Sequence, residues 1–161
     1  MFTIDHNLQA FIYAVRQNKA LTCTSEGLWN LESRFVSKIR CLFGLEERRE
    51  TLLVRGFRKC LERLEKVPVR FMQNREQPAA QVVGYQSYLV AGEALLERTK
   101  GCVSRKVVTE RVALMRSLIA LRYRLEGVNG GLNPTAPPQE LLDNLMHVAE
   151  DWKFSKPIFH D

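Results

Sequence analysis

The sequence predicts an all-α protein, a compact bundle of about six helices without a β-sheet. Three observations support this fold class. Apolar residues recur at spacings of three and four along six segments, as on one face of a helix. Glycine and proline, at Gly44, Pro68, Pro78 and Gly127, separate several of these segments. No stretch alternates apolar and polar residues over a length that would indicate a strand.

The first half of the chain contains three expected helices, over residues 3–18, 25–43 and 45–66. The second has a regular apolar face, formed by Leu28, Leu31, Phe35, Ile39 and Leu42. Gly44 follows it as a C-terminal cap, because glycine adopts the left-handed conformation without a side-chain clash. The short connection at Gly44 indicates that the second and third helices form an αα-hairpin.

The second half contains three further expected helices, over residues 78–99, 102–126 and 137–151. Two of them open with proline, which the first turn of a helix tolerates. In the first of the three, Gly92 lies on the apolar face, so we expect a close approach of another helix there. Apolar residues cover about half the circumference of the helix over 102–126, which predicts that it lies at the centre of the bundle.

The chain is basic, with 24 Lys and Arg residues against 18 Asp and Glu residues and a net charge of +6. Five cations share one stripe of the expected helix 45–66: Arg48, Arg55, Lys59, Arg63 and Lys66. Such a row could follow a phosphate backbone, an acidic protein surface or anionic lipid headgroups. It could equally be a solvated helix face that has no partner.

Two arginines, Arg111 and Arg122, fall within the apolar arc of the expected helix 102–126. An unpaired buried charge is very costly, so each guanidinium must reach solvent, pair with a carboxylate or lie at an interface. Glu93 and Glu97, one turn apart on the preceding helix, are the candidate partners.

The last nine residues form an expected tail that follows a single bundle domain over residues 1–152. The tail, residues 153–161, contains three large apolar side chains, those of Phe154, Ile158 and Phe159. It either packs back on the bundle or docks onto a partner or a second copy of the chain.

No motif indicates catalysis, a metal site or a cofactor. The four cysteines and three histidines lack the spacing of metal ligands, and the glycines at 127–131 lack the Lys-Ser/Thr of a phosphate-binding loop. We therefore expect free thiols in the cytoplasm, no metal, no cofactor and no small-molecule substrate. No apolar run is long enough for a membrane span, and no secretory signal is visible.

The function that these observations favour is a non-enzymatic protein-interaction module, such as an adaptor, a chaperone-like protein or an assembly subunit. Its partner would be another protein or a second copy of the chain. The alternative is a protein that binds nucleic acid without sequence specificity, through the basic stripe on the third expected helix. An enzyme whose site is assembled from distant residues is the weakest interpretation.

Overall fold

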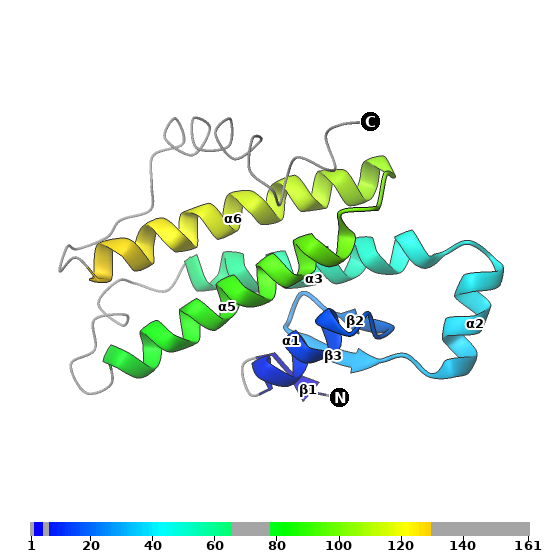
Figure 1. Ribbon diagram of the computed structural model, residues 1–161, viewed down its shortest axis with the longest axis horizontal. Helices are drawn as coiled ribbons and strands as arrows, with labels where there is room; N and C mark the ends of the chain where they lie inside the picture. The colour runs from blue at the N-terminus through cyan, green and yellow to red at the C-terminus, as the bar shows by residue number, and fades with distance from the viewer. Residues whose placement is uncertain (1, 5–6, 66–77, 130–161) are drawn as a thin grey trace.

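The computed structural model describes residues 2–4, 7–65 and 78–129, and the fold is given for this part of the chain (Figure 1). In chain order the elements are β1 (Phe2–Thr3), α1 (Leu8–Arg16), β2 (Leu21–Cys23), β3 (Leu28–Leu31), α2 (Arg34–Leu42), α3 (Glu46–Glu65), α5 (Pro78–Thr99) and α6 (Arg105–Asn129). Helices α3 and α5 occupy the middle of the described structure. Helix α6 packs on one side of them, and α1 and the strands pack on the other.

A three-stranded antiparallel sheet near the N-terminus overturns the prediction of a protein without β-structure. Its strand order is β1-β3-β2, with Phe2 opposite Trp29 and Cys23 also opposite Trp29 from the other side. The strands are two, three and four residues long. Alternation of period two needs a longer run than this to be visible, which is why the sequence did not reveal them.

A tight turn between β2 and β3 fixes this hairpin. Gly27 has a φ of +84°, in the left-handed region that favours glycine. The Gly27 backbone N–H donates to the Thr24 carbonyl, and the Leu28 N–H donates to the Thr24 hydroxyl. The Gly27 carbonyl in turn accepts from the Ile4 N–H at 2.8 Å, which brings the N-terminal segment alongside. The expected helix over 3–18 therefore begins only at Leu8.

The expected helix over residues 25–43 is also wrong, because its first half is strand β3. Ser33 ends the strand segment and caps α2, its hydroxyl accepting from the Val36 N–H at 3.3 Å. Gly44 follows α2 with a φ of +65°, as a C-terminal glycine should. Instead of folding back along α3 in the predicted αα-hairpin, however, α2 stands crosswise at the end of the molecule (Figure 1).

Helix α6 corresponds to the expected helix over 102–126, but it is not central. Among the described residues it contacts α3 and α5, whereas α1 and the sheet lie beyond those two helices. The described part of the chain contains five helices rather than six. The sixth expected helix, over 137–151, and the tail, over 153–161, lie outside the described residues.

Aromatic rings join the layers of the core. The ring of Phe57 on α3 stacks on Phe11 of α1 with 5.7 Å between centroids, and Phe11 also meets Trp29 of β3 at 5.7 Å. Phe57 and Phe11 are fully buried, and Trp29 is 4% exposed. Trp29, rather than Leu28 or Leu31, thus anchors the sheet to the helices.

Two interior glycines allow close packing on either side of the middle helices. A Cβ on Gly56 of α3 would lie 2.3 Å from the Cys23 carbonyl oxygen of β2, so α3 and the sheet backbone nearly touch. A Cβ on Gly92 of α5 would lie 2.4 Å from a side-chain atom of Leu118 on α6. The close approach expected at Gly92 is therefore confirmed.

Candidate interaction surface

Helix α2 is strongly amphipathic, yet none of its residues is buried. The solvent-accessible fraction is 72% for Phe35, 82% for Leu42 and 73% for Phe43, and Val36 is also exposed. With the half-buried Ile39 these side chains form one continuous face, which we call the α2 ridge. Isolated exposed apolar residues are common, whereas a contiguous exposed apolar face is a candidate interaction site.

Cations border the α2 ridge on both sides. Residues four apart on a helix are neighbours on its surface. Lys38 therefore lies beside Leu42, and Arg40 lies beside Val36. From residue 33 to residue 45 the chain contains three cations and no Asp or Glu. The surface is thus an apolar strip with a positive rim.

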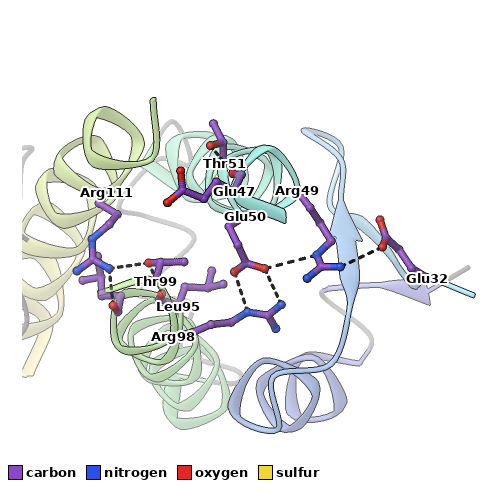
Figure 2. A network of polar contacts seen from close by, with 10 residues as sticks. Glu32, Glu47, Arg49, Glu50, Thr51, Leu95, Arg98, Thr99 and Arg111 are labelled. Carbon is purple, nitrogen blue, oxygen red and sulfur yellow. Dashed lines mark hydrogen bonds and ion pairs between the residues drawn. The ribbon is translucent and has the colours of Figure 1, made fainter. Parts of the chain in front are cut away.

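A chain of ion pairs ties α2 to the body of the protein. The Arg40 Nε on α2 lies 2.7 Å from Glu32, directly after β3, and Arg49 of α3 reaches the other Glu32 oxygen at 3.3 Å. Arg49 also lies 3.5 Å from Glu50. Glu50 accepts two hydrogen bonds of 2.8 Å from Arg98 on α5 (Figure 2).

This ion-pair chain is largely withdrawn from water. The side chain of Arg98 is 5% exposed, that of Glu32 is 5% exposed and that of Glu50 is 11% exposed. A paired guanidinium and carboxylate with two parallel bonds is the strongest geometry for such a contact. These ion pairs therefore position β3, α2, α3 and α5 relative to one another, while the apolar face of α2 stays exposed to solvent.

A shallow groove of about 380 Å³ adjoins α2 on the side of the sheet. Leu31 and Ala20 contribute apolar surface to it, Lys19, Arg34 and Lys38 contribute three cations, and Ser37 and Glu32 complete the lining, with Glu32 paired to Arg40 and Arg49. Neither Arg34 nor Lys38 takes part in an ion pair among the described residues. The groove therefore extends the positive rim of the α2 ridge.

Arg111, one of the two arginines that the sequence singled out, is fully buried. Its guanidinium donates to the Leu96 carbonyl and, at 2.6 Å, to the Thr99 hydroxyl (Figure 2). The Thr99 hydroxyl in turn donates a hydrogen bond to the Leu95 carbonyl. Burial lowers the pKa of Arg111 to about 10, so the side chain is still a cation at neutral pH. Its role is to bind α6 to the C-terminal end of α5.

Arg122 lies in a different environment from Arg111. Its guanidinium pairs with Glu93 at 2.6 Å, and its side chain is 40% exposed. The pair borders an open groove of about 760 Å³, into which Arg16 of α1 and Arg98 of α5 also face. Glu93 was one of its two expected partners, so this arginine is a partly exposed inter-helix contact.

The cations of the expected stripe do not form one uniform surface. Arg55 turns toward α6, where its Nε lies 2.7 Å from Glu110, and Arg63 turns toward the β2–β3 turn, where it contacts Cys60 and approaches Gly27. Arg48 and Lys59 are exposed. Lys66 lies outside the described residues, as do Phe154, Ile158 and Phe159 of the tail.

The sequence did not indicate the α2 ridge as a candidate interaction surface. Its residues were assigned to the inner face of one long helix, together with Leu28 and Leu31. Two signals in the sequence could have separated them. Ser33 is a favourable N-cap in the middle of that segment, and the run from 33 to 45 lacks any acidic residue.

Among the residues that the structure describes, there is neither a metal-binding cluster nor a membrane-spanning helix. No group of three or more His, Cys, Asp or Glu side chains there could hold a metal ion. None of the helices in the described ranges has the length and apolar character needed to cross a bilayer. Compared with known proteins, the chain matches no protein-family model, no curated protein sequence and no solved structure.

Proposed function

We propose that the protein is a non-enzymatic interaction module of the cytoplasm that docks onto its partner through α2. The observation that carries the proposal is the exposed α2 ridge. Phe35, Leu42 and Phe43 are each more than 70% exposed, although burying such side chains stabilises a protein by roughly 1.5–3 kcal/mol each. Burial against a partner would recover this free energy.

The ion-pair chain supports the same proposal. Arg40, at one edge of the ridge, pairs with Glu32, and Glu32 pairs in turn with Arg49 of α3, so these contacts hold α2 in place while the apolar face stays exposed. A partner would therefore meet a helix that is already formed and oriented, and association would cost less ordering entropy. An adaptor or an assembly subunit is served by a docking element built in this way.

Nucleic-acid binding through the basic stripe stays a prediction, with less support than docking through α2. Arg55 is neutralised locally by Glu110, which also pairs with Arg58. Arg55 turns toward Glu110 of α6, whereas Arg63 turns toward Gly27 in the β2–β3 turn. A row of cations that tracks a phosphate backbone would need them to share one direction.

Photo-cross-linking tests docking through α2 in the cells that produce the protein. A photoreactive side chain is introduced at the ridge by Leu42→p-benzoylphenylalanine. We expect a discrete cross-linked product that disappears when Phe35→Ser is added, because the second change removes apolar contact area without touching the probe.

The matched control carries the same photoreactive group at an exposed position on α3, as Lys59→p-benzoylphenylalanine. It should yield no corresponding product. Equal products at both positions, or none at position 42, would show that α2 is not the docking element. The product also reveals whether the bound molecule is a protein or a lipid.

A further inference from the structure

We infer that the partner of the α2 ridge is an anionic lipid surface, on which α2 lies in the plane of the headgroups. This inference rests on the proposed function, because it names the partner of the same helix. Interfacial helices combine a polar face rich in Lys and Arg with an apolar face of Phe and Leu. Helix α2 has this composition, with Phe35, Leu42 and Phe43 outward.

The charges around the ridge match a negative surface rather than a second copy of the ridge. Lys38 lies beside Leu42, Arg34 lies one turn before Lys38 on the same side of α2, and Lys19 lies across the adjoining groove. Two α2 helices packed together would bring these cations against one another, which costs free energy. Against phosphatidylserine, each basic residue near the surface strengthens binding, by about fivefold.

The shape of the surface also favours a lipid over a folded protein. Helix α2 stands at one end of the described structure (Figure 1), and none of its residues is buried. A stable protein interface buries roughly 800 Å² on each partner, and lysine is depleted in it. Here the apolar side chains are confined to one short helix and its flanks, with lysine beside them. A headgroup layer accepts such a ridge without a complementary pocket.

The ridge is held by the body of the protein before any lipid is bound. Arg40 and Arg49 fix α2 through Glu32, and Ser33 caps its N-terminus. A free nine-residue peptide would be mostly unfolded in water, because isolated helices of that length are marginal. Lipid binding by the full chain therefore does not include the free-energy cost of forming the helix.

Sedimentation with vesicles tests the inference on the full chain. We expect binding to vesicles of phosphatidylcholine with one third phosphatidylserine, little binding to phosphatidylcholine alone, and weaker binding as salt is raised. Leu42→Ser with Phe43→Ser should abolish binding. Lys38→Glu with Arg34→Glu should weaken it by more than tenfold, because two attractive charges become repulsive.

The control for charge is Lys59→Glu with Arg48→Glu, which changes the net charge by the same amount on exposed positions of α3. It should bind vesicles as the unaltered protein does. The inference is overturned if the control loses as much binding as the α2 variant, if the serine variant still binds, or if the unaltered protein ignores phosphatidylserine. In that last case, a protein cross-linked at position 42 would leave docking through α2 standing, and no product there would remove both proposals.

Discussion

Glu50→Gln should lower the free energy of unfolding by about 3 kcal/mol, because it leaves buried guanidinium charge without its carboxylate. Arg98 is 5% exposed and donates two hydrogen bonds to Glu50, and Arg49 also lies against it. Glutamine has nearly the same volume, so the change removes the charge and leaves the packing. Urea denaturation of the two proteins measures the difference.

Glu62→Gln is the matched control, since it removes a carboxylate from an ion pair that water reaches. Glu62 pairs with Arg58 four residues earlier on α3, and its side chain is 43% exposed. Pairs of this kind contribute about 0.3–0.5 kcal/mol. If the free energy of unfolding fell by the same small amount in both variants, the ion-pair chain would not hold the elements together as described.

Gly56→Ala should destabilise the protein by about 2 kcal/mol, even though alanine is the better helix former. The new methyl group would lie 2.3 Å from the Cys23 carbonyl oxygen and 2.8 Å from its carbon. These are backbone atoms of β2, so relief requires the sheet to move away from α3. The packing of Phe57 between Phe11 and Tyr88 would be disturbed with it.

Gly92→Ala makes the same chemical change in the neighbouring helix against a softer obstacle. The nearest atoms belong to the side chain of Leu118, which can adopt another rotamer. The gain of about 1 kcal/mol in helix propensity offsets much of that cost. Chemical denaturation should therefore place this variant within about 1 kcal/mol of the parent protein. A larger loss at position 92 than at position 56 would refute this account of the two contacts.

The long helices were accessible from the sequence because their apolar residues repeat over five or more turns. Helices α3, α5 and α6 lie where the periodicity predicted them, within a few residues at each end. The sheet was not accessible. Strands of two to four residues are defined by pairing between segments such as Phe2 and Trp29, and no local repeat records that pairing.

The candidate site was less predictable than the fold. The exposure of Phe35 and Leu42 depends on how the chain turns at Gly44, between α2 and α3. Helical periodicity identifies an apolar face but does not show what covers that face. The pairing of Glu50 with Arg98 was also missed, since the two residues are 48 positions apart in the sequence. In both cases tertiary contacts decide the surroundings of the side chain. The sequence pattern shows only which residues are neighbours along one helix.

The stability of a variant with a truncated ridge is the most direct test of whether the α2 ridge is left free for a partner. The free energy of unfolding of the double variant Phe35→Ala with Leu42→Ala should lie within about 0.5 kcal/mol of that of the unaltered protein, because both side chains are exposed. Leu53→Ala, the same truncation in the core, should lose roughly 2–5 kcal/mol. A loss of 2 kcal/mol or more from the α2 variant would show that the ridge is part of the folded core.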